Sequence, residues 1–511
     1  MSELPPIFPA GDPEQGRALR EHLRGAADRV ADYLIGLGTR PLFPAAAQAP
    51  AGPLLPERGE PLGQVFGESA DWAIDNAIHV GHPGYLGHMD SGVAVAGVMA
   101  DFLASALNQN LLAFELAPGA TLLERALVDL FGAEAGLPDG RGGVFTTGGT
   151  GANLAALLCA RDAACKDTSR LGVGTEKPLA ILASADAHYS IAKAAALLGL
   201  GSERVLPVPV AGPERRLDPA ALPRVFAAAV GRGMRPIAVV ATAGTTSCGA
   251  LDPIDACADF CEEHGMWLHV DGALGGVLML HSAGRAKLPG LHRADSIALD
   301  PHKWLYAPKS AGVLLLRRKD DLRPAGYEAP YLDRLASAAH ARTQSQGRLA
   351  IDGSRRFDAL KVWMILRHLG RQGIAKLHQD RLELTAWFHQ ALSEHPFFLP
   401  RHRPDLNVQA FGPRDSAREP EVAAAHLVIE NQGSLWTSLT RLEQRPSHRV
   451  VLLNPAGGRD HLTAALTALE AAHRRVSGPS SDASRGASGP PEGSASPAPS
   501  SSASMADPAG D

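Results

Sequence analysis

Apolar runs of strand length alternate with helix-like segments through the middle of the chain, and this pattern constrains the fold more than any other feature. Strand-like runs such as "PLAILAS", "RPIAVVATA" and "MWLHVDGA" are separated by helix-like segments such as "YSIAKAAALLGL" and "DPIDACADFCEEHG". Apolar strands joined by helical connections are typical of a mostly parallel sheet that helices cover on both faces. The sequence therefore predicts an α/β fold, with a ligand site beyond the carboxyl ends of the strands.

The chain is long enough for one large domain and a smaller companion. It has 511 residues, of which 45% are hydrophobic and 20% charged, as is ordinary for a globular protein. We expect an N-terminal helical segment at 1–90, a large domain at 91–370, a smaller C-terminal domain at 371–476 and a disordered tail at 477–511. The tail is rich in Ser, Pro, Gly and Ala, so it cannot bury enough apolar surface to offset its ordering entropy.

Charge and cysteine content argue against several classes of protein. The net charge of -5 gives no basic surface for nucleic acid. The five cysteines are too few and too irregular for a disulfide framework, and Cys257 and Cys261 are better explained as small buried hydrophobes than as a metal site. The N-terminus lacks a signal-peptide pattern, and no stretch reaches about 18 uninterrupted apolar residues. We therefore expect no membrane span and a cytoplasmic location.

The stretch "DPHKWLY" at residues 300–306 places Lys303 just after the apolar run "SIAL". Two interpretations are open for this lysine. It is either a surface charge that lies near the core, or a reactive amine held at the end of a strand. The residues at the other predicted strand ends favour the second interpretation.

Four more predicted strand ends carry glycine or polar residues. These are Gly149 and Thr150 after "GGVFTT", His188 after "PLAILAS", Thr246 after "RPIAVVATA", and Asp271 at the end of "MWLHVD". Backbone N–H groups at a glycine-rich helix start can bind a phosphate, although such turns also occur for steric reasons alone. A lone histidine is more often structural, whereas a carboxylate after an apolar run is costly unless it meets a cation.

Pyridoxal phosphate requires all of these features together. A lysine amine forms a Schiff base with its aldehyde, a glycine turn suits its phosphate, and an imidazole can lie over its ring. A carboxylate beside the ring nitrogen keeps the ring protonated, so that it stabilises a carbanion at the substrate Cα. We infer that Lys303 attaches this cofactor and that Asp271 pairs with the ring nitrogen. A nucleotide-binding protein, by contrast, would need a Walker lysine, which the glycine turn lacks.

The segments "HVDGALGG", "DPHKW", "TTGGTGANLAAL", "HPGYLGHMDSG", "NQNLLAFELAPGATLLE" and "GSRRFDALKVW" resemble the group II pyridoxal-phosphate-dependent amino acid decarboxylases. That family includes aromatic amino acid, glutamate, cysteine sulfinate and diaminobutyrate decarboxylases. The resemblance covers roughly residues 75 to 475. It implies the aspartate-aminotransferase fold, also called fold type I, with a large, mostly parallel seven-stranded sheet domain and a smaller C-terminal α+β domain. It also implies a homodimer.

The resemblance assigns roles to individual residues. Lys303 matches the Schiff-base lysine, Asp271 the partner of the pyridine nitrogen, and His188 the imidazole stacked on the ring. The remaining matches to cofactor-binding positions are Gly149, Thr150, Thr246, Ala273 and His302. Arg355 matches an arginine that holds the substrate carboxylate, although a solvated charge at a helix start is the alternative. Tyr331 matches a tyrosine on a mobile loop that protonates Cα, although an incidental tyrosine on a surface loop is the alternative.

Departures from the family pattern bear on the substrate. His88 and Asp90 stand where glutamate- and sulfinate-specific members place amide and hydroxyl side chains. If Asp90 faces the pocket, its carboxylate repels an acidic substrate and favours a cationic, neutral or aromatic one. Gly151 and Asp300 also depart from the pattern, with no effect that the sequence defines.

The sequence therefore predicts decarboxylation of an L-amino acid to its amine and carbon dioxide. Another fold-type-I activity is the nearest alternative, namely an aminotransferase, a carbon–sulfur lyase or an oxidative decarboxylase, because the orientation of the substrate decides which bond breaks. A non-catalytic relative that keeps the fold is a further alternative.

Overall fold

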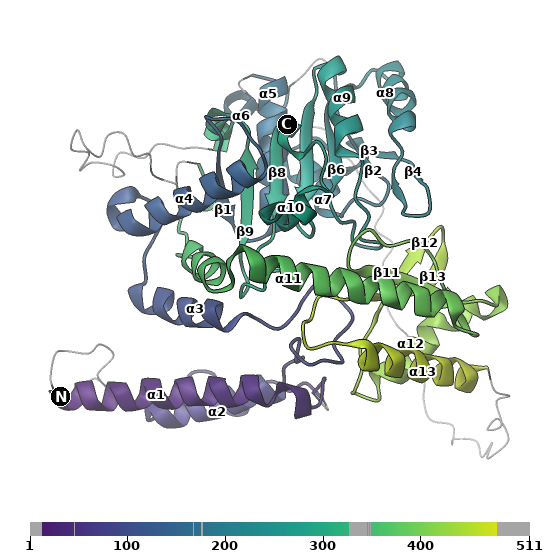
Figure 1. Cartoon of the computed structure of the whole chain (residues 1–511). Coiled ribbons are helices and arrows are strands. Elements are labelled where there is room, and N and C mark those ends of the chain that lie inside the picture. Colours follow the sequence, from purple (N-terminus) through teal and green to yellow (C-terminus); the bar gives the residue numbers. More distant parts are fainter. Residues whose placement is uncertain are drawn as a thin grey trace, which may run out of the picture. The chain divides into compact units, whose positions relative to one another are not determined.

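The computed structural model describes residues 13–44, 46–166, 168–174, 177–325, 345, 347 and 349–477. Contacts divide the chain into two units, Met1–Val476 and Ser477–Asp511, and every element below belongs to the first. Figure 1 shows the elements in chain order. No helix within the described ranges is long and apolar enough to cross a membrane.

A seven-stranded sheet forms the centre of the larger part of this unit, in the order β1-β9-β8-β7-β6-β2-β3. The strands are β1 (Gly142–Thr146), β2 (Leu179–Ser184), β3 (Val205–Val208), β6 (Arg235–Thr242), β7 (Trp267–Gly272), β8 (Ser296–Leu299) and β9 (Gly312–Leu316). Strand β9 is antiparallel to both of its neighbours, and the other pairs are parallel. The predicted mostly parallel seven-stranded sheet is therefore confirmed.

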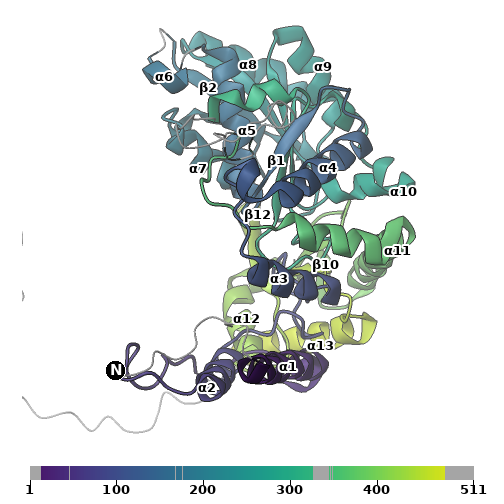
Figure 2. The same ribbon diagram turned by 90° about the vertical axis from the view of Figure 1, so that its left-hand side faces the viewer.

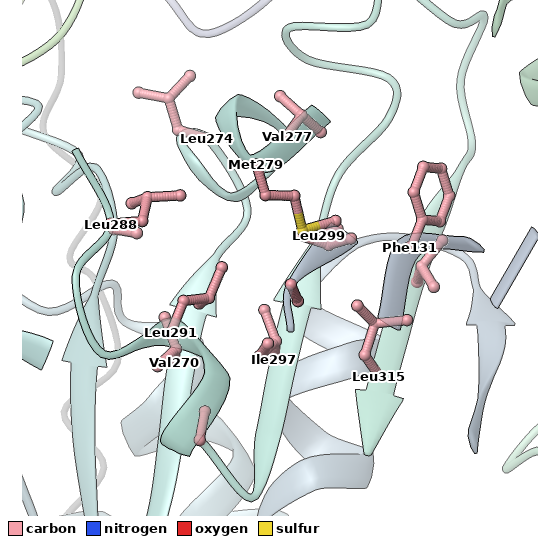
Figure 3. Packing of buried hydrophobic residues seen from close by; sticks show 14 of the residues in the cluster. Phe131, Val270, Leu274, Val277, Met279, Leu288, Leu291, Ile297, Leu299 and Leu315 are labelled. Atoms are coloured by element: carbon pink, nitrogen blue, oxygen red, sulfur yellow. The ribbon is translucent and has the colours of Figure 1, made fainter. Parts of the chain in front are cut away.

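Both faces of this sheet are buried, as the continuous apolar strands require. Successive residues of β9 alternate between two apolar clusters: Val313 and Leu315 belong to one, and Leu314 and Leu316 to the other. Figure 3 shows the first cluster, where Phe131 lies near Leu315 of β9 and the apolar residues of β8. The second cluster packs against the alanine-rich helix that follows β1.

Helices cover both faces of the large sheet, and further helices lie away from it. They are α1 (Pro13–Ile35), α2 (Leu62–Asp75), α3 (Val95–Leu107), α4 (Pro118–Glu134), α5 (Gly149–Ala164), α6 (Thr168–Leu171), α7 (Ser190–Leu197), α8 (Leu222–Gly231), α9 (Ile254–His264), α10 (Ser282–Arg285), α11 (Ala359–Glu394), α12 (Val422–Glu430) and α13 (Arg459–Val476). Helices α4, α8, α9 and α11 contribute to the first cluster, and α5 and α7 to the second. Cys257 and Cys261 of α9 are buried in the first cluster, as small hydrophobes would be.

A second, smaller sheet follows α11 and has the order β10-β11-β13-β12. Its strands are β10 (Phe398–Pro400), β11 (Val408–Pro413), β12 (Ser438–Leu442) and β13 (Arg445–Val451), all antiparallel, and α12 and α13 pack beside it. The short strands β4 (Val210–Ala211) and β5 (Arg216–Leu217) form a separate hairpin. Helix α11 is interrupted at Gly370, whose φ of 61° breaks the helical geometry. The predicted boundary at 370 falls at this interruption and stays a prediction.

The strand directions bring five chain segments to one edge of the large sheet. Strand β1 is antiparallel to β9, and β9 is antiparallel to β8, so β1 and β8 point the same way. Consequently the carboxyl ends of β1, β8, β7, β6 and β2 meet at the same edge. This is the edge where an open α/β sheet binds its ligand.

Replacing Leu315 with alanine tests how tightly this core is packed. Leu315 is fully buried in β9, so Leu315→Ala should lower the free energy of unfolding by about 2–5 kcal/mol. Leu197, which is 64% exposed on α7, is the matched control, and Leu197→Ala should change stability by less than about 0.5 kcal/mol. Urea denaturation at fixed protein concentration measures both, and equal losses would contradict the assignment of the core.

Candidate functional site

A cavity of about 350 Å³ lies at the carboxyl edge of the large sheet, and its walls come from the ends of β1, β2, β6, β7 and β8. All the residues expected to hold the cofactor line it: Gly149, Thr150, His188, Thr246, Asp271, Ala273, His302 and Lys303. They are spread over more than 150 positions of the sequence, from 149 to 303, and the strand order brings them together. The volume falls in the range of small-molecule sites.

Lys303 is held at the end of β8 and not on the open surface. Its side chain is 21% exposed, and its Nζ lies 3.1 Å from Oδ2 of Asp300. The other oxygen of Asp300, Oδ1, is buried and makes no hydrogen bond to any residue of the described ranges. The first interpretation of Lys303, an incidental surface charge, therefore does not describe its position.

Two neutral histidines support the chain just after Lys303. The Nε2–H of His378 on α11 donates to the carbonyl of Trp304 at 3.0 Å, and its Nδ1 accepts from Nε2–H of His281 at 3.1 Å. Burial lowers the pKa of His378 to about 4, so that the imidazole is neutral near pH 7. Trp304 itself is fully buried. The backbone beside Lys303 is thus fixed from the core side.

Asp271 is 4% exposed at the end of β7. Its Oδ2 accepts from Nδ2 of Asn153 at 2.9 Å, and its Oδ1 accepts from the backbone N–H of Ala273 at 3.2 Å. Both donors are neutral. The buried carboxylate is therefore oriented without being neutralised, and the cavity side remains open to a cation.

The glycine turn between β1 and α5 supplies backbone N–H groups, which bind an anion where Asp271 would bind a cation. Helix α5 begins at Gly149 on the cavity wall, where the first backbone N–H groups of a helix have no partner within the helix. A Cβ at Gly149 would lie 2.9 Å from Oδ2 of Asp300 and 3.1 Å from Cβ of Ala273. A larger residue would therefore fill the floor of the cavity.

Three further predicted residues complete the wall. Nδ1 of His188 lies 2.8 Å from Oγ of Ser190, and burial lowers its pKa against the opposing effect of Asp271. His302 donates from Nδ1 to the Ala311 carbonyl at 2.7 Å, and burial lowers its pKa as well. The carbonyl of Thr246 accepts from Arg449 in the small sheet at 2.8 Å.

The chemistry of this donor set fits pyridoxal phosphate. A free carboxylate at Asp271 suits a protonated ring nitrogen, the start of α5 suits a phosphate, and Lys303 supplies an amine. The orphaned Oδ1 of Asp300 marks a polar group for which the described chain offers no partner. The cavity therefore suits a small polar molecule that carries both a negative and a positive charge.

Arg355 lies apart from this cavity. Its Nη2 donates to both carboxylate oxygens of Glu124 at 2.6 Å and to the Phe145 carbonyl at 3.2 Å. Its Nη1 is buried, has no hydrogen-bond partner among the described residues, and belongs to a guanidinium that lines a second cavity of about 360 Å³. Thr147 lines both cavities. The alternative of a solvated charge does not apply, since the side chain is only 6% exposed.

His88 and Asp90 also lie outside the lining of the first cavity, and the residue between them, Met89, lines it instead. Asp90 binds Nζ of Lys309 and accepts from Tyr85 Oη at 3.3 Å, and His88 lies 3.0 Å from Nη2 of Arg449. The expected repulsion of acidic substrates by Asp90 therefore has no support from this geometry.

Tyr331 lies outside the described residues.

Sequence reasoning missed Asn153, which contacts Asp271 from one turn inside α5. A signal was present, because an amide among the alanines and leucines of "GANLAAL" must find a partner once it is buried. The second signal is His269, which is two residues before Asp271 and thus on the same face of β7. Spacing alone could not identify which groups they meet.

The comparisons with known proteins show the family of the chain. Residues 44–411 match the family model described as "Pyridoxal-dependent decarboxylase conserved domain". The chain is 36% identical over 406 residues to L-2,4-diaminobutyrate decarboxylase of Rhizobium meliloti (strain 1021), covering 78% of this chain and 80% of that protein. It is 34% identical over 349 residues to cysteine sulfinic acid decarboxylase of Mus musculus, covering 67% and 69%.

Solved structures show the same architecture. The apo form of mouse CSAD superposes with a TM-score of 0.80 at 29% identity, covering 89% of this chain and 99% of that chain. Oryza sativa TDC with PLP and tryptamine gives a TM-score of 0.83 at 23% identity, covering 92% and 99%, which is a likeness of fold alone. The fold expected from the sequence is therefore confirmed.

His378, which bonds the Trp304 carbonyl, makes the free energy of unfolding depend on pH. The pKa of His378 is lowered from 6.5 to about 4, so the unfolded chain binds one more proton than the folded protein between these values. The free energy of unfolding should fall as pH falls through this window. His378→Gln should remove up to about 1.4 kcal/mol per pH unit of this slope. Thermal denaturation from pH 7 to pH 4 measures it, with the exposed His368→Gln on the same helix as the control; an unchanged slope in His378→Gln would refute the assignment.

Proposed function

The chain belongs to the pyridoxal-dependent decarboxylase family and decarboxylates an amino acid with pyridoxal phosphate, and we propose that the residues lining the cavity at the carboxyl edge of the large sheet carry out this reaction. The observation that carries the proposal is the convergence of Lys303, Asp271 and the start of α5 on one cavity. Under this proposal an L-amino acid loses carbon dioxide and the corresponding amine is released.

Pyridoxal phosphate, when bound, supplies a protonated heteroaromatic ring that withdraws electrons from the substrate Cα. Lys303 would hold the cofactor covalently through Nζ and would supply the amine that releases the product. Its partner Asp300, 3.1 Å away, holds that amine at the cavity wall. Asp271 would accept a hydrogen bond from the ring nitrogen and would keep the proton there, because its own two donors are neutral.

The phosphate group would be held by backbone N–H groups at the start of α5, with Gly149 and Thr150 on the wall. His188 and Ala273 would flank the ring. Thr246 and His302 would close the remaining sides. These roles follow from the cavity that the residues share and from the chemistry of their groups.

Return of a proton to Cα requires a donor beside the cavity. His188 offers its Nε2, because its Nδ1 is turned toward the hydroxyl and the backbone N–H of Ser190. Tyr331, in a segment outside the described residues, is proposed as the second donor.

Arg355 is proposed to orient the substrate carboxylate through Nη1. That nitrogen is buried without a partner, and the cavity that its guanidinium lines shares Thr147 with the cofactor cavity. The bonds to Glu124 hold the guanidinium in place, so that orienting the carboxylate costs little side-chain entropy.

Orientation decides between decarboxylation and the alternatives. An aminotransferase, a carbon–sulfur lyase or an oxidative decarboxylase could use the same lysine and aspartate. The family favours decarboxylation, and the named relatives act on both a cationic and an acidic amino acid. Because Asp90 is paired with Lys309, its charge does not choose between them.

A panel of L-amino acids tests the proposed reaction directly. Purified protein with pyridoxal phosphate would be incubated with cationic, neutral, aromatic and acidic substrates, and carbon dioxide, amine, keto acid and aldehyde would be measured. We expect carbon dioxide and amine in equal amounts from at least one of them. Keto acid, aldehyde or a released thiol as the main product would instead identify one of the alternatives.

Lys303→Ala is the decisive variant. It should abolish the visible absorption band of the bound cofactor and lower the decarboxylation rate by about a thousandfold or more, since attachment and amine catalysis are both lost. Lys376→Ala, at an exposed lysine of α11, is the matched control and should keep both. A Lys303→Ala protein that still attaches the cofactor covalently, as judged by mass spectrometry after borohydride reduction, would remove the basis of the proposal.

We further propose that the protein is a cytoplasmic homodimer. All five cysteines carry free thiols, which suits a reducing compartment. Helices α1 and α2 lie side by side in both views (Figures 1 and 2). Both helices, and α3 as well, carry exposed apolar side chains. On α3, Val95, Met99, Phe102 and Leu103 share one face and are between 49% and 60% exposed. A second copy of this chain is the proposed cover for this surface.

Charges on this face should break the dimer. The double variant Met99→Glu/Phe102→Glu places two carboxylates where apolar contact is expected, so it should shift the protein from dimer to monomer. Analytical ultracentrifugation measures the masses. Leu427→Glu, at a 55% exposed leucine of α12, should leave the dimer intact. A wild-type monomer, or a double variant that stays dimeric, would contradict the proposal.

A further inference from the structure

A buried amide connects two residues of the cavity that belong to different strand ends. Asn153 of α5 is 1% exposed. Its Nδ2 donates to Oδ2 of Asp271 and to Oγ of Ser190, each at 2.9 Å, and its Oδ1 lies 2.9 Å from Nε2 of His269. Both hydrogens and the oxygen of this amide are therefore used.

The direction of these hydrogen bonds is fixed by the carboxylate. An ionised Asp271 only accepts, so the amide must present Nδ2 to it and Oδ1 to His269. The proton of His269 is consequently on Nε2, and its Nδ1 accepts from Ser296 Oγ at 2.9 Å. Ser296 in turn accepts from Nε1–H of Trp267 at 2.8 Å.

The imidazole of His269 is neutral in this pattern, because Nδ1 carries no proton when it accepts from Ser296 Oγ. His269 is fully buried, and burial lowers its pKa to about 4. The series of hydrogen bonds that links Trp267 to Asp271 thus has one consistent arrangement of hydrogens at neutral pH. It acts as a rigid support behind the carboxylate.

The other branch reaches His188. Ser190 Oγ accepts from Asn153, so its own hydrogen is free to bond Nδ1 of His188 at 2.8 Å. The backbone N–H of Ser190 also points at this nitrogen, at 3.3 Å. Nδ1 of His188 is therefore an acceptor, and its ring proton is on Nε2.

We propose that Asn153 is a positioning residue that holds the Asp271 carboxylate ready for the ring nitrogen of the cofactor and, through Ser190, sets the proton on His188. The inference rests on the proposed role of Asp271. A neutral amide suits this task, because it orients the carboxylate and leaves its charge for the cofactor. A cationic residue at 153 would compete with the ring nitrogen.

A purely structural role for Asn153 is the alternative. The amide could serve only to satisfy His269 between α5 and β7, as buried polar groups require. Removing it would then loosen the site in general and weaken every ligand alike. A positioning role predicts a loss that depends on the ring nitrogen itself.

The test compares two ligands on the full-length apo protein. One is pyridoxal phosphate, and the other is 1-deazapyridoxal phosphate, in which carbon replaces the ring nitrogen. Dissociation constants are measured by quenching of tryptophan fluorescence at pH 7.5. The dissociation constant of the deaza ligand divided by that of pyridoxal phosphate reports the contribution of the ring nitrogen. Asn153→Ala should lower this ratio about tenfold, the scale of one hydrogen bond to a charged group.

Two control variants separate the branches. Asn407→Ala removes another fully buried asparagine, which bonds the Leu452 carbonyl in the small sheet, and should keep the wild-type ratio. Ser190→Ala removes only the branch to His188 and should keep it as well. If Asn153→Ala does not fold, Asn153→Ser, which is smaller and retains a hydroxyl, should lower the ratio in the same direction.

The possible outcomes are distinct. An Asn153 variant that keeps the wild-type ratio would overturn the inference, as would an equal fall in all three alanine variants. A wild-type protein that binds neither ligand would instead overturn the proposed function. A selective fall in the Asn153 variants, with the deaza ligand bound as tightly as by the wild type, supports the positioning role.

Discussion

A carboxylate that is buried with neutral donors alone governs the architecture of this site. Asp271 accepts from an amide and a backbone N–H, and neither supplies the positive charge that a buried carboxylate needs. Under the proposed function, a protonated heteroaromatic nitrogen of the cofactor would supply that charge. Burial would then strengthen the interaction between Asp271 and the ring, since a low local dielectric increases the attraction between opposite charges.

The sheet delivers the other groups to that carboxylate with little freedom. Lys303 follows β8, the neighbour of β7, and the core side of its loop is fixed where His378 bonds the Trp304 carbonyl. The start of α5 is fixed through β1, because Glu124 accepts from the Phe145 backbone N–H at 3.1 Å. Groups that must meet within a few ångströms thus follow the ends of strands, and hydrogen bonds from core residues hold these strand ends in place.

What the sequence could predict depended on how local the signal was. The positions of Lys303 and Asp271 on the cavity wall could be predicted, because a polar residue after an apolar run marks the end of a buried strand and the parallel sheet brings such ends together. The environments of Arg355 and Asp90 were not found, because their partners Glu124 and Lys309 lie 231 and 219 positions away. Asn153 was missed for the same reason, since its bond to Asp271 spans 118 positions. Nothing in the spacing of residues encodes such pairs.

The pairing of Arg355 has a consequence for the proposed reaction. A carboxylate loses its charge as carbon dioxide leaves, so a strong cation beside it would stabilise the bound substrate more than the transition state. The guanidinium of Arg355 is already bonded to Glu124, which offsets its charge and leaves Nη1 as a donor. Such a group can orient the carboxylate while contributing little net attraction to the charge that disappears. The Arg355–Glu124 pair therefore suits an enzyme that must hold a carboxylate in one direction and then let it go.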